Sequence, residues 1–335
     1  MSIKQQRWTI VSCANDKFAT GLIMAMASCL ARSTGQVVYD FVALDGELSE
    51  VSKAKLEKVL FEVSERQQVP YTLRYIKPEK ALTDRLPQRA GTWMAYARLL
   101  LYELLDDQRV VYIDSDILLM RGIEDFFTQW EKSFPFAGIQ DPKKYLRKDW
   151  SLKGEKVDSK EVYFNTGLLG MDLNWMRENM TIEIFFEWVE KIGYEKLRYA
   201  DQTVINTACR GLIQQMPREN NWVLATELAA QVDEKWREVN LHYVGRIKPW
   251  MTPRCDSRRY LPEMLFKKAA EVYGIAEIES RILSEAEVAK NQKKAFWYRF
   301  LSPKRAVMYQ RLVDFIKPAE KIISEIEEAE FYLSK

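Results

Sequence analysis

The chain has 335 residues, of which 47% are hydrophobic and 29% charged, and its 50 basic and 48 acidic side chains leave a formal net charge of +2. This composition excludes global disorder and is enough for one large globular domain or two small ones. A nearly neutral chain gives no overall electrostatic argument for nucleic acid, and we expect no nucleic-acid partner. The four cysteines, at positions 13, 29, 209 and 255, have no close spacing. Their spacing argues against a zinc ribbon, a redox pair or a dense disulfide framework and suits a reducing cytoplasm.

Neither a membrane span nor a secretory signal is predicted near the N-terminus. The longest charge-free apolar stretch there, from Phe18 to Ala31, is too short to cross a bilayer and is typical of a buried helix. The residues before it carry polar groups where a signal peptide needs an uninterrupted apolar region, so we expect a cytoplasmic protein. The dinucleotide-binding glycine pattern and the phosphate loop ending in Gly-Lys-Ser/Thr are both absent, which excludes those two nucleotide-binding classes.

Short β-rich runs alternate with amphipathic segments through the first 250 residues. Strands are predicted at 7–12, 37–44, 71–76, 109–113, 136–139, 163–171 and 241–244. Helices are predicted from about Phe18, from about Ser49, and at 92–105, 181–191 and 201–209. This alternation predicts an α/β fold with a mostly parallel central sheet and helices on both faces.

The pattern changes after residue 250, where prolines punctuate helical, basic and aromatic segments and no further strand is predicted. We therefore expect an α/β domain over 1–250 and a helical C-terminal subdomain over 251–335.

Two acids stand directly after the apolar run 110–113, which should form a central strand. Side chains two positions apart in an extended segment face the same side, so the carboxylates of Asp114 and Asp116 can converge on one point. Carboxylates this close repel unless a cation or a proton lies between them, and ligands of open α/β sheets bind at the carboxyl ends of strands. The pair predicts a divalent metal site. The alternative is a loop in which both acids are solvated.

His242 is the only histidine of the chain, which excludes multi-histidine metal centres. Close to it lie Gly245, which permits close backbone approach, and Lys248, a point charge suited to phosphate. One interpretation is a loop that grips an anion beside a metal, and the alternative is a satisfied core histidine. An imidazole beside two carboxylates favours Mn²⁺ over Mg²⁺, the second candidate ion.

Three further strings accompany these residues: Ala95-Tyr-Ala-Arg98, Tyr163-Phe-Asn-Thr-Gly-Leu-Leu-Gly-Met-Asp172 and Asp201-Gln-Thr-Val-Ile-Asn206. Together with Tyr112-Ile-Asp-Ser-Asp116 and the string from His242 to Trp250, they resemble glycosyltransferase family 8 in order and spacing. The resemblance covers about residues 7 to 250 and is strongest for bacterial lipopolysaccharide-type galactosyl- and glucosyltransferases.

That resemblance implies a GT-A nucleotide-sugar-binding fold, a UDP-sugar donor, manganese, and transfer of a hexose with retention of configuration to a glycan or glycolipid such as lipopolysaccharide core. Its metal ligands would be Asp114, Asp116 and His242. Its donor-binding residues would be Ala14, Asn15, Phe18, Arg98, Asp114, Ser115, Asn165, Gly245 and Lys248. Its residues at the reacting carbon would be Asp201 and Gln202. Relatives usually carry an acid where Asn15 stands and an Asn-Tyr pair where this chain has Lys17-Phe18, so contacts to the uracil differ here.

Structural and functional alternatives stay open at this level. Most apolar residues of 163–172 suit a core strand, Asp201 can cap a helix, and a buried Arg98 needs an acidic partner in any function. For the reaction we favour front-face attack by the acceptor hydroxyl, with Asp201 as the alternative nucleophile. A non-catalytic nucleotide-sugar-binding protein and a metal-dependent nucleotidyltransferase are the competing functions.

Residues 293–311 contain six basic residues, five aromatic residues and no acid. This mixture suits the interface of an anionic membrane, where a lipid-linked acceptor would be found, and would make the protein peripheral on the inner face. The alternative is a helical hairpin packed on the core with solvated lysines. Arg254, Arg258 and Arg259 form a second basic cluster, expected to touch acceptor phosphates.

Overall fold

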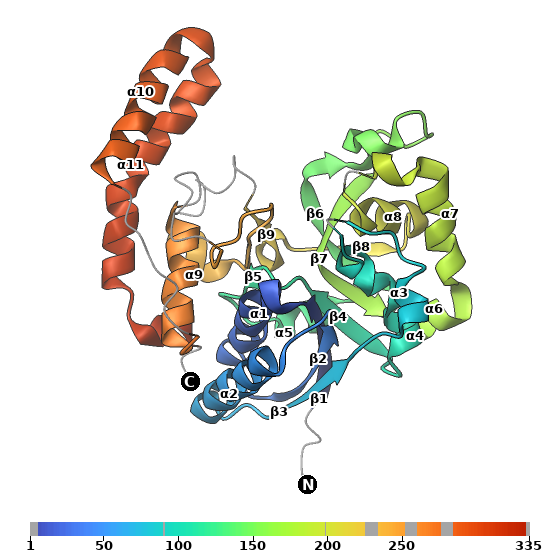
Figure 1. The fold of residues 1–335 in the computed structure, drawn as a ribbon. Helices are drawn as coiled ribbons and strands as arrows, with labels where there is room; N and C mark the ends of the chain where they lie inside the picture. The colour runs from blue at the N-terminus through green and yellow to red at the C-terminus, as the bar shows by residue number, and fades with distance from the viewer. Residues whose placement is uncertain are drawn as a thin grey trace.

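The computed structural model of the protein describes residues 6–89, 91–197, 199–224, 234–251, 260–275 and 284–332. A central seven-stranded sheet carries helices on both faces, and a helical hairpin extends from one side (Figure 1). In spatial order the strands are β3 (Tyr71–Ile76), β2 (Val37–Asp45), β1 (Gln6–Ala14), β4 (Arg109–Ile113), β7 (Val162–Asp172), β6 (Phe136–Tyr145) and β8 (Ile213–Met216). The predicted fold class is confirmed.

The strand order creates a switch point between β1 and β4. From β1 the chain moves outward through β2 to β3, then returns to place β4 on the other side of β1, all in parallel. The crevice outside the carboxyl ends of such strands is where open α/β sheets bind ligands. Strand β7 runs antiparallel to both β4 and β6, so its middle residues lie beside the carboxyl end of β4.

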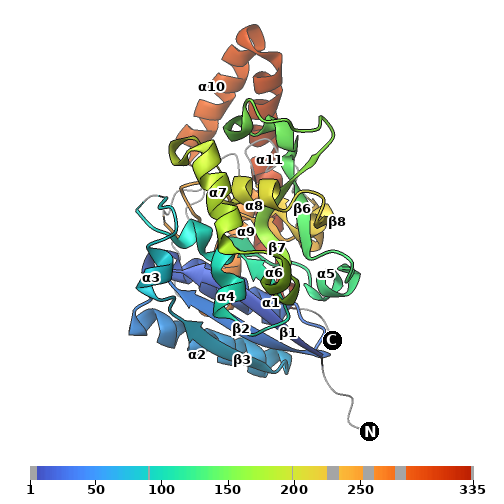
Figure 2. The ribbon, with the colours of Figure 1, turned by 90° about the vertical axis from the view of Figure 1, so that its right-hand side faces the viewer.

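Two apolar cores lie on opposite faces of the sheet, because successive side chains of a strand point to opposite faces. In β1, Ile10 contributes to one core and Val11 to the other. Helices α1 (Ala19–Ala31), α2 (Glu50–Gln67) and α5 (Glu124–Gln129) contribute to the first core. The second core takes in the short helix α3 (Lys80–Thr83) together with α4 (Leu101–Leu104), α6 (Leu173–Asn179), α7 (Ile182–Ile192) and α8 (Asp201–Ala208) (Figure 2).

Two predicted elements differ from expectation. The helix predicted at 92–105 is a 3-10 helix over Met94–Leu100 that continues as α4. Residues 96–101 are all buried, so this segment has no exposed face of the kind that an amphipathic α-helix shows. The strand predicted at 241–244 shortens to β10 (Leu241–His242) because the Val244 amide turns back to the carbonyl of His242. It joins a second, small sheet with β5 (Ile117–Leu118) and β9 (Trp222–Val223).

The C-terminal region is helical where the structure describes it, as predicted, with α9 (Tyr260–Val272), α10 (Glu285–Leu301) and α11 (Pro303–Glu325). Helices α10 and α11 form a hairpin that stands away from the sheet in both views (Figures 1 and 2). The rings of Tyr298 and Tyr309 stack between them at 5.5 Å. The Arg254, Arg258 and Arg259 cluster and Cys255 lie outside the described residues.

Cys13, Cys29 and Cys209 are free thiols buried in the protein. Among the described helices, none combines the length and the apolar character that crossing a bilayer requires.

Candidate metal and donor site

Four chain segments bring the predicted site residues together at the switch point. Asp114 directly follows β4, and its amide donates to the carbonyl of Gly167 in β7 at 2.7 Å. Strand β10 pairs with β5 so that His242 lies opposite Ile117, and the Tyr243 amide donates to the carbonyl of Asp116 at 2.9 Å. Backbone hydrogen bonds therefore fix both acids and the histidine before any side chain is considered.

One oxygen of each carboxylate faces the imidazole. His242 Nε2 lies 3.2 Å from Asp116 Oδ1 and 3.7 Å from Asp114 Oδ2. One ligand atom from each of the three residues lies within 4.8 Å of the other two. Two hard carboxylate oxygens and one imidazole nitrogen form a donor set that suits a divalent ion such as Mn²⁺. The residues that the sequence assigned to the metal therefore fit one.

The second oxygen of Asp116 pairs with Lys248, whose Nζ also donates to the carbonyl of Tyr243 at 2.9 Å. Burial raises the pKa of Asp116, but Lys248 and His242 outweigh it and hold that pKa well below the usual range. Gly245, with a φ of +106°, lies in the turn between His242 and Lys248. A left-handed backbone favours glycine at that position. Lys248 is thus a buried cation beside the candidate metal site.

The second oxygen of Asp114 pairs with Arg98, whose NH2 lies 2.7 Å away. Its Nε lies 2.9 Å from Asp201 Oδ2, its NH1 donates to the carbonyl of Thr166, and its guanidinium lies 4.1 Å from the ring centre of Tyr112. Burial opposes the charge, yet Asp114 and Asp201 raise the pKa of Arg98 above its ordinary value. Arg98 therefore links Asp114 of the candidate metal site to α8 as a permanent cation.

Asp201 and Gln202 open α8, and both are buried. Burial raises the pKa of Asp201 to about 6, against the opposing effect of Arg98. Thr166 Oγ1 donates to Asp201 Oδ2 at 3.1 Å. The preceding residue, Ala200, has a φ of 52°, a conformation that costs a non-glycine residue about 1–3 kcal/mol. Such strain is common where the surrounding structure positions functional groups.

The amides of Asn165 and Gln202 are engaged within the protein. Gln202 Oε1 accepts from Asn165 Nδ2 at 3.1 Å and from the Thr166 amide at 3.3 Å. Both side-chain amides also donate to Asp141 Oδ2, at 3.3 Å each. Asn165, predicted to bind the donor, and Gln202, predicted to lie at the reacting carbon, therefore form one buried network with Asp141.

The loop after β1 lies on the other side of the switch point. The Ala14 carbonyl accepts from Gly46, and Asn15 Oδ1 is buried with no hydrogen-bond partner among the described residues. Phe18 packs edge-on against Trp250 at 6.0 Å between ring centres. Ser115 is buried, and a Cβ on Gly21 of α1 would run into its carbonyl oxygen. The roles of these residues toward a donor stay predictions.

Sequence reasoning missed two residues of this cluster. Asp141 follows the apolar run 136–139 after one polar residue, a weaker form of the signal that pointed to Asp114, and it has no second acid two positions away. Asn221 Oδ1 lies 2.9 Å from His242 Nδ1, and Asn221 directly follows a 3-10 helix over Arg218–Asn220 that has no recognisable sequence pattern. Its contact depends on the small sheet, which periodicity cannot predict from two-residue strands.

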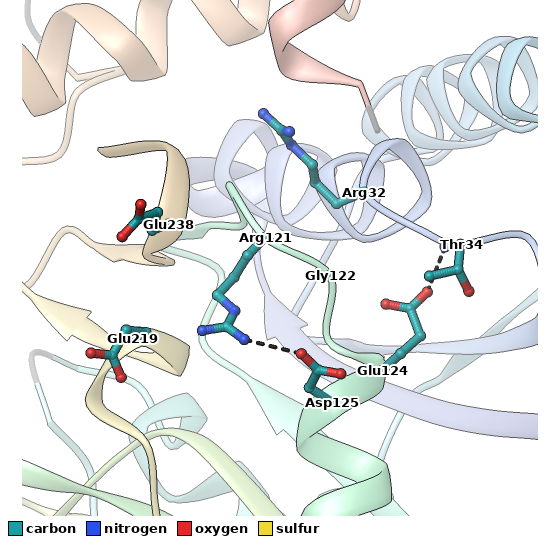
Figure 3. A pocket seen from close by; sticks show the side chains of 8 residues that line it. All are labelled: Arg32, Thr34, Arg121, Gly122, Glu124, Asp125, Glu219 and Glu238. Carbon is teal, nitrogen blue, oxygen red and sulfur yellow. Dashed lines mark hydrogen bonds and ion pairs between the residues drawn. The ribbon is translucent and has the colours of Figure 1, made fainter. Parts of the chain in front are cut away.

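A separate cavity of about 500 Å³ lies at the other end of the small sheet (Figure 3). In this cavity the Arg121 side chain turns toward Asp125. The side chains of Glu219 and Glu238 turn away from Arg121, so these four charged groups do not converge. None of its lining residues belongs to the predicted site.

Comparison with known proteins identifies the fold and then the family. The fold is the GT-A fold of glycosyltransferases: a galactosyltransferase, LgtC, solved in complex with donor and acceptor sugar analogs, matches with a TM-score of 0.65 and 22% identity, over 84% of this chain and 99% of that one. The model of glycosyl transferase family 8 matches residues 9–253, and the chain belongs to that family.

Two relatives show how far sequence similarity extends. General stress protein A of Bacillus subtilis is 24% identical over 263 residues, which cover 74% of this chain and 88% of the relative. A lipopolysaccharide 1,2-glucosyltransferase of Escherichia coli K12 is 25% identical over 202 residues, which cover 56% of this chain and 58% of the relative. The suspected family is confirmed, and the chain is a glycosyltransferase.

Proposed function

We propose that this glycosyltransferase is metal-dependent and moves glucose or galactose, with retention of configuration, from a UDP-sugar to a glycan or glycolipid acceptor such as lipopolysaccharide core. The observation that carries the proposal is the convergence of His242 Nε2 with one oxygen each of Asp114 and Asp116 at the carboxyl end of β4. The E. coli relative, named as a lipopolysaccharide glucosyltransferase, supports the class of acceptor.

Cleavage of the donor leaves negative charge on the departing UDP and positive character on the sugar. A bound Mn²⁺, or Mg²⁺ as the second candidate, would supply Lewis-acid stabilisation of the leaving diphosphate. Lys248 adds a cation whose position is fixed by the Tyr243 carbonyl, so a donor phosphate can share it with Asp116. Charges already in place for the transition state lower a barrier without reorganisation. Arg98 likewise fixes the position of Asp114, because it pairs with one oxygen of that carboxylate.

The hydrogen bonds of α8 favour front-face attack over a covalent intermediate. An amide oxygen is a weak nucleophile, and that of Gln202 already accepts two hydrogen bonds. One oxygen of Asp201 is held by Arg98 and Thr166. In the front-face reaction the acceptor hydroxyl attacks as UDP leaves, and its proton passes to a phosphate oxygen. A glycosyl adduct trapped on Asp201 or Gln202 would overturn this part of the proposal.

The α10–α11 hairpin is the proposed contact with an anionic membrane, which would make the protein peripheral on the cytoplasmic face. Five of its apolar side chains are exposed: Phe296, Trp297, Phe300, Leu301 and Val307. They stand in the segment 293–311, which has six basic residues and no acid. Aromatic side chains enter the headgroup region while basic ones pair with anionic lipids. A hairpin packed on the core, the alternative, would leave fewer apolar rings in water.

The test is a screen of UDP-sugars with and without Mn²⁺, read out by UDP release and by the anomeric configuration of the product. We expect metal-dependent UDP release from UDP-glucose or UDP-galactose and a product that keeps the donor's configuration. A nucleotide-sugar-binding protein would release no UDP, and a nucleotidyltransferase would give a different product. An inverted product or metal-independent turnover would contradict the proposal.

A further inference from the structure

A chain of buried hydrogen bonds runs from a backbone amide of β7 to the imidazole of the metal site. The Gly167 amide donates to Asn165 Oδ1 at 2.9 Å, and Asn221 Nδ2 donates to the same oxygen at 2.8 Å. Asn221 Oδ1 lies 2.9 Å from His242 Nδ1. Asn165, Asn221 and His242 are 5%, 1% and 3% exposed, so water does not compete for these bonds.

The direction of this chain follows from its first member. A backbone N–H can only donate, so the atom of Asn165 that faces Gly167 must be the oxygen. That oxygen needs a donor from Asn221, which turns the Asn221 amide nitrogen toward it and the Asn221 oxygen toward His242. An oxygen acceptor at Nδ1 requires a proton on Nδ1.

The hydrogen bonds of the Asn165 side-chain nitrogen independently require the same orientation of that amide. The Thr166 amide, again only a donor, requires the atom of Gln202 that it meets to be the oxygen. Gln202 Oε1 and Asp141 Oδ2 then both accept from Asn165 Nδ2. Reversing either amide would place like atoms together, and each buried polar group left unpaired costs about 1–3 kcal/mol.

We infer that Asn221 is a positioning residue that keeps a proton on His242 Nδ1 and thereby leaves Nε2 as the nitrogen available to a metal. Nε2 is the atom that faces Asp114 Oδ2 and Asp116 Oδ1. Partners that hold the far nitrogen of a metal-binding histidine fix its tautomer and its ring orientation. The inference deepens the proposed metal-dependent function and rests on it for its purpose, but the tautomer itself can be measured without metal or substrate.

The single histidine makes that measurement direct, because selective ¹⁵N-histidine labelling yields the signals of one ring. Spectra would be recorded on the metal-free full chain at alkaline pH and again with Zn²⁺ as a diamagnetic probe. We expect the proton on Nδ1 in both, although a neutral histidine in water prefers its proton on Nε2. A ring whose Nδ1 lacks its proton in either spectrum overturns the inference.

Variants separate positioning from simple packing. Asn221→Leu removes the acceptor, so we expect loss of the Nδ1–H preference and Mn²⁺ binding weaker by roughly 10–100-fold, the usual effect of removing a partner of a metal ligand. Asn221→Asp keeps an acceptor and should keep the Nδ1 proton. Asn220→Leu is the control, because Asn220 is as buried but bonds to the carbonyl of Pro217. It should leave tautomer and Mn²⁺ affinity unchanged.

The outcomes distinguish this inference from the proposed function. An unchanged tautomer in Asn221→Leu overturns the positioning role, and if that variant does not fold, the wild-type and Asn221→Asp spectra still decide. A wild-type protein with a protonated Nδ1 that binds no Mn²⁺ would support the hydrogen-bond chain while overturning the metal-dependent function. A wild-type protein that binds Mn²⁺ but has no proton on Nδ1 would overturn the hydrogen-bond chain and leave the metal-dependent function in place.

Discussion

Gly167 lies against the imidazole of His242, and replacing it with alanine tests the geometry of the proposed metal site. A Cβ at this position would stand 2.7 Å from His242 Nδ1 and closer still to Cε1, whereas ordinary contacts begin at 3.4 Å. The ring must therefore retreat by at least about 0.7 Å. Gly167 is not among the glycines with a positive φ, so the substitution acts through this contact rather than through backbone strain.

Displacing the ring should weaken both folding and metal binding. Overpacking of a tightly packed site costs about 1–3 kcal/mol of unfolding free energy. A shift of the ligand nitrogen away from Asp114 and Asp116 should weaken Mn²⁺ binding by about tenfold or more, comparable to the loss of a supporting contact. The assays are urea unfolding of the metal-free protein and titration of Mn²⁺ followed by electron paramagnetic resonance.

Gly170→Ala is the matched control, because Gly170 lies on the same strand and its Cβ would meet Trp130 at 2.9 Å instead of His242. It should destabilise the protein to a similar extent and leave Mn²⁺ affinity at the wild-type value. Equal Mn²⁺ affinity in Gly167→Ala and Gly170→Ala would refute the placement of His242 Nε2 in a metal site.

Three further perturbations follow from the electrostatics and the exposed surface. Because the pKa of Asp201 is raised to about 6, its contribution to stability is present below about pH 4 and lost as pH rises through 6. Without metal, wild type should lose about 3 kcal/mol relative to Asp201→Asn between pH 4 and 8 in urea unfolding; parallel curves would contradict this. Lys248→Met breaks the buried pair with Asp116 and should lower the unfolding free energy at pH 7 by about 3–5 kcal/mol; an unchanged urea midpoint would show that the pair does not form. Trp297 and Phe300 are 64% and 74% exposed, so replacing both with serine should change stability by less than about 0.5 kcal/mol yet weaken sedimentation with anionic vesicles; retained sedimentation would remove the hairpin as a membrane contact.

Two strands were predicted with the bounds that the structure shows, by different signals. The run Val110 to Ile113 of β4 is apolar and buried throughout. Strand β3 lies at the edge of the sheet, and its residues from Tyr71 to Tyr75 alternate between half-buried and exposed, as the period of a strand requires. The two-residue strands β5 and β9 were not predicted, since periodicity needs a longer segment. The segment Met94–Leu100 is a 3-10 helix but was predicted as an α-helix. The spacing of apolar residues in the sequence does not show that this segment packs against its surroundings on several sides.

The candidate site was predictable as residue types and less so as a network. Two acids that follow a buried strand repel each other unless a cation or a proton lies between them, which is why Asp114 and Asp116 could be named as candidate metal ligands from local sequence. The roles of Asn221 and Asp141 depend on contacts across tens of residues, made by β10 and by the antiparallel insertion of β7. The pairing of Lys248 with Asp116 likewise spans distant segments, and only the fold brings them together.

Metal-dependent release of UDP by His242→Ala, compared with wild type, tests whether His242 holds a metal that the reaction needs. The donor is whichever UDP-hexose the wild type uses, Mn²⁺ is varied, and circular dichroism confirms that the variant is folded. We expect the variant to keep its fold and to lose most of the Mn²⁺-dependent rate, since one of the three converging ligand atoms is gone. A folded His242→Ala protein with the full Mn²⁺-dependent rate would contradict it.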